Sequence, residues 1–458
     1  MIFIKHILKP LFFLGATCIL PGSYKGFYSN HLFNSKEIKK STKTDKLGIK
    51  PCFLIISDIH LNSGTGIQQA ADSNDDSGNV LWDSAKNKIN KIIDSESPQF
   101  VIVLGDLPFH AEPSDSNQLY KARNNAGTVL NQLRDISEKK TIPLLFVPGN
   151  NDSYGGDYHF FSNEIFAGDS IGKDNWPIIN GIKESKLAND PLIADASQAE
   201  LGYYAAYPLG KTIPLRVIVM NTVMFNPQNR DTKDTIWNYD GNDPTSRNKD
   251  AKQQIQWLRL QLQKAKSNNE HVLIAMHIPL GKNGYHRSKE PVKDFWDSSL
   301  KFNDRSVQNI FLDLADSFKN NIIGILSGHT HMDGIRLLRN RRKDNISSLV
   351  ISAPGIAPGH GNNPALKLIY YNRHNLELED FKTFYMNYQE NKQITNWDSS
   401  FGFRGLTNSA TSMLKYVRDK RNSERIRIFI ERTYSASSRQ DPSKKEESNE
   451  TIYVDYQK

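Results

Sequence analysis

Side chains that commonly bind metal ions occur in short motifs, each directly after an apolar run of the chain. They are Asp58, His60, Asp106, Asn150, His277, His329 and His331. Carboxylate, amide and imidazole groups are ligands for divalent cations. Two adjacent cations can polarise a phosphate ester and lower the pKa of a bound water. The motifs therefore predict a two-metal site suited to the hydrolysis of phosphate esters.

The spacing within two motifs indicates how the ligands point. Residues two apart on an extended chain project to the same side. Asp58 and His60 are two apart, as are His329 and His331, so we expect each pair to face a common point.

The elements that must position these ligands are buried strands alternating with helices. Near-continuous apolar runs predict strands at residues 53–57, 100–105, 144–147, 215–221, 271–276, 322–327 and 348–352. Helical patterns fall at residues 80–94, 120–139, 250–267 and 306–319. The alternation predicts an α/β domain with a sandwich of sheets flanked by helices. Ligands collect beyond the carboxyl ends of strands in such folds, where every motif lies.

Other segments break this pattern. Residues 62–79 are rich in Gly, Asp and Ser, and we expect a mobile insertion without a role rather than a loop over the site. Residues 225–249 are also long and carry Trp237 and Tyr239, which could stack on a base or cover a choline group. Residues 409–422 predict a helix with a basic face, and the chain from Ser435 onward should be frayed.

The N-terminus predicts export. Lys5, His6 and Lys9 precede an apolar stretch from residue 11 to 20, as in a secretory signal peptide. We expect residues 1–23 to be this signal, residues 24–50 to be a linker, and the protein to be secreted or periplasmic. Lipoprotein anchoring at Cys18 is the weaker alternative. The net charge of +8 suits anionic substrates or an anionic membrane and does not indicate a nucleic-acid partner.

Longer motifs carry a family resemblance. Gly105-Asp106-Leu107-Pro108-Phe109-His110, Met276-His277-Ile278-Pro279 and Gly328-His329-Thr330-His331 resemble calcineurin-like metallophosphoesterases, in particular their acid sphingomyelinase-like group. The likeness covers roughly residues 50 to 435. It implies a four-layer α/β/β/α sandwich at residues 51–371. A C-terminal extension with a small helical subdomain would follow at 372–438, and a polar tail at 439–458.

The resemblance also implies how the ligands divide. Asp106 would bridge both metals, with Asp58, His60 and His331 on the first metal and Asn150, His277 and His329 on the second. The family uses Zn, Mn or Fe, and we expect zinc. A hydroxide held between the metals would attack phosphorus. Asp152 should orient a metal ligand rather than act as an acid.

One residue departs from the common family pattern. Asn151 stands where most members carry a catalytic His, a variant that resembles endopolyphosphatases and some microbial sphingomyelinase-like proteins. Asn can donate a hydrogen bond but cannot deliver a proton at neutral pH. His110 and His159 are the candidates to protonate the leaving oxygen in its place. His286 and His360 are weaker candidates, expected to be surface histidines.

The resemblance implies an exported phosphodiesterase that is sphingomyelinase-like. An endopolyphosphatase or nucleotide phosphohydrolase is the alternative within enzymes, and an inactive metal-binding recognition module is the alternative outside them. The substrate would be a phospholipid head group, a nucleotide or polyphosphate. The sequence shows no counterpart of the lipid-presenting, saposin-like domain of mammalian relatives. We therefore expect soluble phosphodiesters to be accepted at least as well as bilayer lipid. The basic helix could dock on an anionic membrane.

Overall fold

The computed structural model describes residues 50–457, with gaps. The gaps are residues 67–68, 73–74, 154, 160, 162–175, 178–181, 185–190, 228–243, 284–292, 398, 404–410, 434–435 and 437–451. The predicted signal peptide and linker lie outside the described residues, as do Trp237, Tyr239 and His286.

The first sheet has six strands in the order β15-β14-β13-β1-β2-β3. Its strands are β1 (Cys52–Ile56), β2 (Val101–Val103), β3 (Leu144–Phe146), β13 (Ala365–Tyr371), β14 (Leu378–Tyr385) and β15 (Ser399–Gly402). The three strands β1, β2 and β3 are parallel, and two helices connect them, α1 (Asn79–Glu96) and α2 (Ser116–Lys140). The carboxyl ends of these strands therefore meet at one edge of the sheet.

The second sheet has eight strands in the order β16-β11-β12-β10-β7-β6-β5-β4. Its strands are β4 (Ile193–Asp195), β5 (Tyr204–Ala206), β6 (Leu215–Met220), β7 (His271–Met276), β10 (Ile322–Ser327), β11 (Gly334–Arg339), β12 (Ile346–Ser352) and β16 (Tyr453–Val454). The strands β6, β7, β10 and β12 run parallel. Helix α3 (Pro244–Ser267) precedes β7, and α4 (Val307–Ser317) follows the short pair β8 (Lys301–Phe302) and β9 (Arg305–Ser306).

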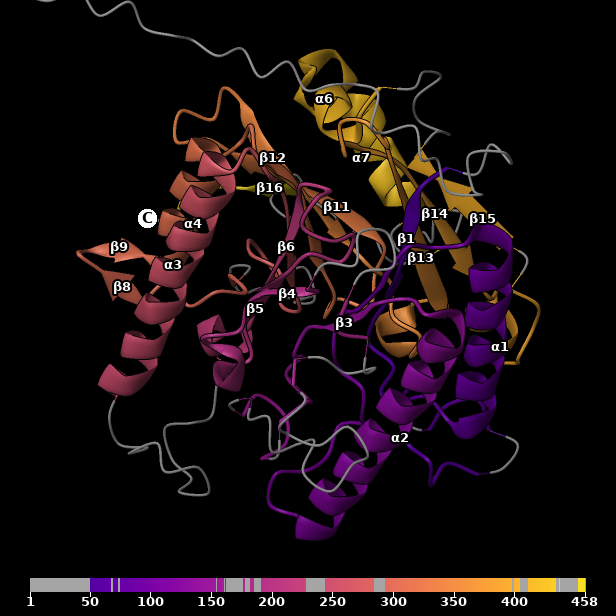
Figure 1. Ribbon diagram of the computed structural model, residues 1–458. Coiled ribbons are helices and arrows are strands. Elements are labelled where there is room, and N and C mark those ends of the chain that lie inside the picture. Colours follow the sequence, from indigo (N-terminus) through magenta and orange to yellow (C-terminus); the bar gives the residue numbers. More distant parts are fainter. Residues whose placement is uncertain are drawn as a thin grey trace, which may run out of the picture. The chain divides into compact units, whose positions relative to one another are not determined.

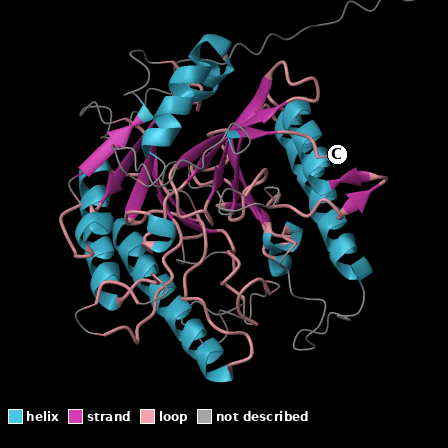
Figure 2. Ribbon diagram, turned by 180° about the vertical axis from the view of Figure 1, so that it is seen from behind, coloured by secondary structure: helices cyan, strands magenta, loops and turns pink. Residues whose placement is uncertain are grey.

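The two sheets pack face to face, and side-chain alternation shows how. On β7, Leu273 and Ala275 belong to the core that also contains β1, α1 and α2. Val272 and Ile274 belong instead to the core that contains α3 and α4. Strand β7 of the second sheet thus buries both faces, one against the first sheet and one against helices. The predicted α/β class is confirmed, with helices outside two central sheets (Figures 1 and 2).

Local sequence signals explain where the helices start. Asp115 caps α2 by accepting hydrogen bonds from the backbone N–H groups of Asn117 and Gln118, and Ser306 caps α4 through the N–H of Asn309. These caps satisfy donors that a helix leaves unpaired at its first turn. Among the described helices, none is both long and apolar enough to span a bilayer.

The C-terminal part is more integrated than expected. Strands β14 and β15 extend the first sheet, so the boundary predicted at residue 371 does not separate two compact units; residues 50–458 form one. Helix α6 (Met413–Arg418) packs on β12 and β14, and α7 (Ser423–Thr433) packs on β11. Of the basic helix predicted at 409–422, residues 409 and 410 lie outside the described residues; within 411–422 the α-helix spans 413–418 and a 3-10 turn follows.

The end of the chain is ordered against the second sheet. Strand β16 pairs in parallel with β11, and Ile452 and Val454 are buried. Asp455 accepts hydrogen bonds from the Arg339 guanidinium at 2.7 and 2.5 Å. The fraying predicted from Ser435 onward is therefore wrong for residues 452–457, since a two-residue strand is too short to show a pattern in the sequence.

Candidate active site

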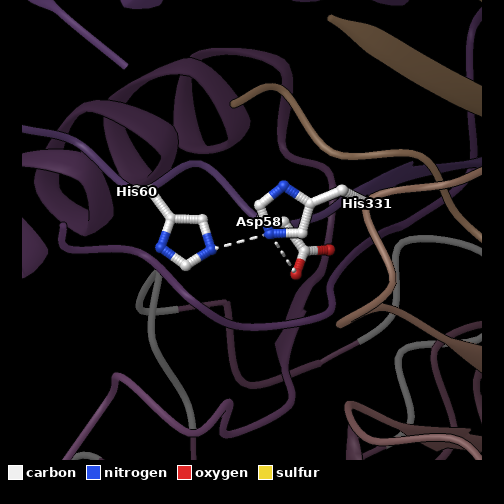
Figure 3. A group of neighbouring side chains, drawn as sticks. All are labelled: Asp58, His60 and His331. Atoms are coloured by element: carbon white, nitrogen blue, oxygen red, sulfur yellow. Dashed lines mark hydrogen bonds and ion pairs between the residues drawn. The ribbon is translucent and has the colours of Figure 1, made fainter. Parts of the chain in front are cut away.

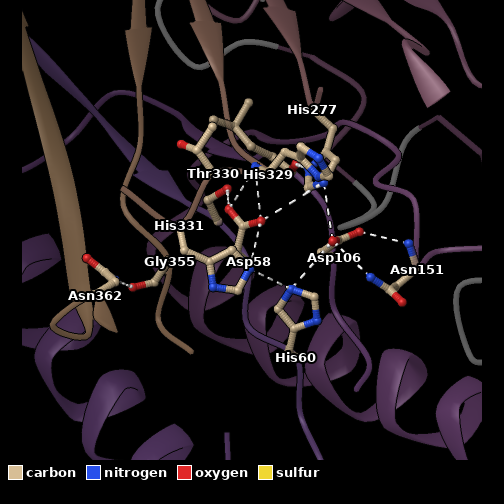
Figure 4. A network of polar contacts seen from close by, with 12 residues as sticks. Asp58, His60, Asp106, Asn151, His277, His329, Thr330, His331, Gly355 and Asn362 are labelled. Carbon is tan, nitrogen blue, oxygen red and sulfur yellow. Dashed lines mark hydrogen bonds and ion pairs between the residues drawn. The ribbon is translucent and has the colours of Figure 1, made fainter. Parts of the chain in front are cut away.

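The predicted ligands meet where parallel strands of both sheets end. Asp58 and His60 follow β1, Asp106 follows β2, and His329 and His331 follow β10. All five have left-handed backbone conformations, with φ between 45° and 69°. This conformation is unfavourable for residues other than Gly, and such strain is characteristic of functional sites. The turns aim the side chains at a common centre (Figure 4).

The first cluster comprises Asp58, His60 and His331 (Figure 3). The Nε2 atoms of His60 and His331 are 3.1 Å apart, and Nε2 of His331 is 3.6 Å from Oδ1 of Asp58. Burial, followed by the charge of neighbouring imidazoles, holds the pKa of both histidines well below the ordinary range. Both rings are therefore neutral and offer lone pairs, as metal ligands must.

The second cluster comprises Asp106, His277 and His329. Nε2 of His277 lies 3.2 Å from Oδ2 of Asp106 and 3.0 Å from Oδ1 of Asn150. The ring is fixed from behind, because its Nδ1 is 2.6 Å from the carbonyl oxygen of Leu104. Such a contact from the second ring nitrogen is typical of metal-binding histidines.

Asp106, a member of the second cluster, also approaches the first cluster. Its Oδ2 is 3.2 Å from Nε2 of His277 and 3.4 Å from Nε2 of His60. Burial opposes its ionisation, but the charge and hydrogen bond of His277 outweigh burial and hold its pKa well below the usual range. Burial likewise opposes a charge on His277, yet the carboxylates raise the pKa of His277 to about 9. In the absence of metal, a proton on His277 thus neutralises charge that a cation could neutralise instead.

Asn151 and Asp152 support Asp106 in different ways. The backbone N–H of Asn151 donates to Oδ1 of Asp106 at 2.8 Å, and its side-chain amide donates to Oδ2 at 3.0 Å. The Asp152 carboxylate accepts from the backbone N–H groups of Asp106, Leu107 and Gly149 at 2.7 to 2.9 Å. Asp152 thereby ties the turn after β2 to the turn after β3.

Four histidine rings form a row through the first cluster. His110 stacks on His60 with ring centroids 4.3 Å apart, and His60 stacks on His331 at 4.8 Å. The ring of His360 meets His331 edge-on at 5.3 Å. The two outer histidines are exposed while the inner two are buried. His360, expected to be an ordinary surface histidine, therefore lies beside the site.

His159 differs from His110 in its surroundings. It is buried in a turn, where its N–H donates to the carbonyl oxygen of Gly156, and its ring packs against Gly155. It is not a member of the clusters formed by the described residues. The other predicted proton donor, His110, is in ring contact with the metal ligand His60.

The sequence analysis missed Asp76. This carboxylate is 1% exposed, and its Oδ1 lies 2.7 Å from Nδ1 of His110. Burial alone would lower the pKa of His110, but the hydrogen bond and charge of Asp76 raise it to about 9. Since the His110 side chain is 43% exposed, solvent screens part of this effect. The only signal in the sequence was an acidic pair within a Gly- and Ser-rich loop.

The residues present fit a pair of divalent cations. Burial raises the pKa of Asp58 to about 7, although the charge of His277 opposes this shift. Nδ1 of His331 and Oδ1 of Asn151 are buried without a hydrogen-bond partner among the described residues. Cations would supply further positive charge and invert the local pKa pattern. Mixed oxygen and imidazole donors suit Zn, Mn or Fe.

Comparison with known proteins agrees with this arrangement. The family model for calcineurin-like phosphoesterases matches residues 53–333, which is more than half of the chain. The chain belongs to the calcineurin-like phosphoesterase family, and the resemblance inferred from its motifs is confirmed.

Two similar curated proteins are named phosphodiesterases. The chain is similar to cyclic GMP-AMP phosphodiesterase SMPDL3A of Bos taurus, with 23% identity over 339 residues, 70% of this chain and 65% of that protein. It is also similar to acid sphingomyelinase-like phosphodiesterase 3b of Homo sapiens, with 28% identity over 197 residues, 41% of this chain and 38% of that protein. A dimetal phosphatase from Danio rerio matches at 12% identity and a TM-score of 0.46, covering 77% of this chain and 98% of that one. The chain thus spans about 65% of the length of the SMPDL3A relative.

Proposed function

We propose that this protein is a metal-dependent phosphodiesterase with two divalent cations. The observation that carries the proposal is the position of Asp106, whose Oδ2 lies within 3.4 Å of imidazole nitrogens from both clusters. Asp58, His60 and His331 would hold one cation, and Asn150, His277 and His329 the other. Bound together, the cations would polarise the phosphoryl oxygens and lower the pKa of a water held between them.

The protein's own side chains supply the remaining chemistry. Asn151 donates two hydrogen bonds to Asp106 and so holds its carboxylate in place. His110 is the residue that we assign to protonation of the leaving oxygen, because its exposed ring borders the first cluster and a proton is available from an imidazole near neutral pH. His159 lies in a buried turn, and in this proposal it stabilises the loop after β3. Zinc is the cation we favour, with Mn or Fe as alternatives.

For the substrate, we propose soluble phosphodiesters, including nucleotide diesters. The support is the likeness to a cyclic GMP-AMP phosphodiesterase together with two exposed histidines at the site. Sphingomyelin would be hydrolysed in detergent micelles and poorly in bilayers. An endopolyphosphatase or nucleotide phosphohydrolase remains the alternative, motivated by the Asn-Asn-Asp sequence at residues 150–152.

A substrate panel tests the proposal. Purified protein, with Zn or Mn added, would be assayed on bis-p-nitrophenyl phosphate, a cyclic dinucleotide, ATP, polyphosphate, and sphingomyelin in micelles and in bilayers. We expect diester hydrolysis that chelation abolishes and metal restores. Preference for ATP or polyphosphate would favour the alternative enzymes. No bound metal and no metal-restored activity on any substrate would instead indicate an inactive recognition module.

We further propose export, supported by the charged and apolar pattern of residues 5–20. N-terminal sequencing of protein recovered outside the cytoplasm would test cleavage near residue 23. We do not extend the proposal to membrane docking, because the basic residues near α6 are engaged within the protein. Lys415 contacts Glu377 at 2.8 Å, Arg418 donates to backbone carbonyls, and Arg421 pairs with Asp419.

A further inference from the structure

We propose that Asp76 is a positioning residue whose carboxylate acts on two histidines, the metal ligand His60 and the proton donor His110. The inference rests on the proposed function, because it assumes that His110 protonates the leaving oxygen. It gives a role to the loop between residues 62 and 79, for which the sequence predicted none.

The loop fixes Asp76 against the strand end that carries His60. The N–H of Ser77 donates to the carbonyl oxygen of His60 at 2.9 Å, and the N–H of Asn62 donates to the carbonyl oxygen of Ser77 at 2.8 Å. Asp72 accepts from the N–H of Asp76 at 3.0 Å and from the Asn62 amide at 2.8 Å. These bonds place the carboxylate before any ligand arrives, which is the requirement for preorganisation.

The Asp76 carboxylate then faces both rings. Its Oδ1 is 2.7 Å from Nδ1 of His110 and 3.8 Å from Nδ1 of His60. Its Oδ2 accepts from the backbone N–H of His110 at 3.3 Å. The two rings lie nearly parallel, with an interplanar angle of 8°. A single buried carboxylate therefore holds His110 by hydrogen bonds to its ring and backbone, and places negative charge beside His60.

This contact fixes which nitrogen of His110 is free to act. An acceptor at Nδ1 keeps a proton on that atom, so Nε2 is the atom left to exchange a proton with the substrate. When the bond from phosphorus to the leaving oxygen breaks, that oxygen keeps the electron pair and receives the Nε2 proton. A water oxygen forms the new bond to phosphorus and releases a proton to solvent, which reprotonates His110. His60 differs, because its Nδ1 lies 3.8 Å from the same carboxylate, beyond hydrogen-bond distance, so Asp76 acts on this ring only through its charge.

The test uses Asp76→Asn, His110→Ala and the double variant, each loaded with Zn. Asp75→Asn is the matched control, because it removes a charge from the same loop and Asn tolerates the positive φ of 62° found there. Each protein would be assayed on bis-p-nitrophenyl phosphate, whose leaving group needs no proton, and on a dinucleotide with an alkoxide leaving group. Metal content and Tm would be measured alongside.

We expect Asp76→Asn and His110→Ala to lower kcat on the dinucleotide by about 100-fold or more, in the range of general acid catalysis. Loss on bis-p-nitrophenyl phosphate, which reports the action on His60, should stay below about tenfold, and the double variant should show no larger difference between the two substrates than His110→Ala, since coupled residues are not additive. Asp75→Asn should match the parent protein.

The other outcomes distinguish a failure of the His110 assignment from a failure of the inference about Asp76. Equal losses on both substrates for His110→Ala would reject His110 as the donor, and the inference about Asp76 would fall with it. A selective loss for His110→Ala without one for Asp76→Asn would overturn the inference alone. Equal losses on both substrates for Asp76→Asn, accompanied by loss of metal, would also overturn it, because Asp76 would then act only through His60.

Discussion

Asp106 has a distinct partner at each of its carboxylate oxygens. Oδ1 accepts only from the backbone N–H of Asn151 among the hydrogen bonds described above, whereas Oδ2 faces the Asn151 amide, His60 and His277. A neutral amide in this place would present an NH₂ group to at least one donor. The site thus depends on the charge of residue 106 as well as on its shape.

Asp106→Asn should lower phosphodiester hydrolysis by at least about 1,000-fold and reduce the bound metal, since two cations lose their shared negative ligand. Steady-state rates and metal analysis would measure both effects. Asp135→Asn, at a carboxylate that is 60% exposed on α2, is the control and should match the parent protein. Near-normal rates in metal-free Asp106→Asn would rule out the proposed mechanism.

The stability of the protein should also depend on a buried ion pair beneath the site. Lys367 on β13 is fully buried, and its Nζ lies 2.6 Å from Oδ1 of Asp333 and 3.1 Å from the Thr383 hydroxyl. Asp333 also accepts from that hydroxyl at 2.6 Å. The pair lies between the two sheets, and Asp333 is two residues beyond His331. Neither side chain could stay buried there as an unpaired charge without a large loss of stability.

Lys367→Met should destabilise the metal-free protein by about 3–5 kcal/mol, because it leaves a buried carboxylate without its cation. The variant Lys367→Met/Asp333→Leu should recover most of that loss, since an apolar replacement of both partners is often neutral. Urea unfolding of the parent, single and double variants would measure the difference. A double variant as unstable as the single one would show that the charge pair itself is not what matters.

Among the individual residues of the site, the sequence predicted the clustered metal ligands but not Asp76. The ligands Asp58, Asp106 and His277 could be found because each follows a buried apolar strand. Asp76 follows no such strand, and its partner His110 is 34 residues away. Its position depends on how a loop folds back on residues 60–62, which local patterns do not encode.

Among the elements, β16 shows how a short segment can complete a large sheet. It pairs with β11, and beyond it Gln308 donates to the carbonyl oxygen of Asp455 at 3.0 Å. The N–H of Gln457 donates to Asn309 at 2.7 Å. This strand covers an edge that would otherwise expose unpaired backbone groups. The sequence could not predict it, since its stability comes from partners more than 100 residues earlier.

Docking of β16 should weaken in acid. Burial opposes ionisation of Asp455, but its bonds to Arg339 and Lys343 lower its pKa. A carboxyl group with a lowered folded pKa stabilises the docked state above its unfolded pKa, near 3.9, and loses that contribution as pH falls through the folded value. Hydrogen exchange of residues 452–457, normalised to β7, should therefore increase below about pH 4.

Asp455→Asn is the comparison for this experiment. Its tail should exchange faster than that of the parent protein already at pH 6, and acid should increase its exchange much less. A parent tail whose protection relative to β7 is the same at pH 3 and pH 6 would contradict the assignment of Asp455 as the group that holds it.

Over the whole molecule, the site joins the two sheets. Asp58, Asp106 and Asn150 come from the ends of β1, β2 and β3 in the first sheet, while His277 and His329 come from β7 and β10 in the second. The class of fold was predictable because seven apolar runs and four helical patterns alternate along the chain. The boundary at 371 was not, because β14 and β15 return to pair beside β13 after the alternation has ended.

Metal binding should stabilise the whole domain, because the unfolded chain does not hold these ligands together. At a free cation concentration 100 times the Kd, the free energy of unfolding should rise by about 2.7 kcal/mol. Thermal unfolding of chelated protein titrated with Zn or Mn would measure this rise. A Tm that does not respond to either cation would contradict the two-metal centre.

The order of the ligands along the chain has a consequence for biosynthesis. The first donors to be synthesised are Asp58, His60, Asp106 and Asn150. His331 lies 181 residues after Asn150. Strand β13, which pairs with β1, is made later still. A nascent chain therefore leaves the ribosome with an incomplete set of donors through most of its synthesis. The proposed two-metal site can therefore form only after His331 has been made, and we expect the cations to be selected in the compartment where the domain folds.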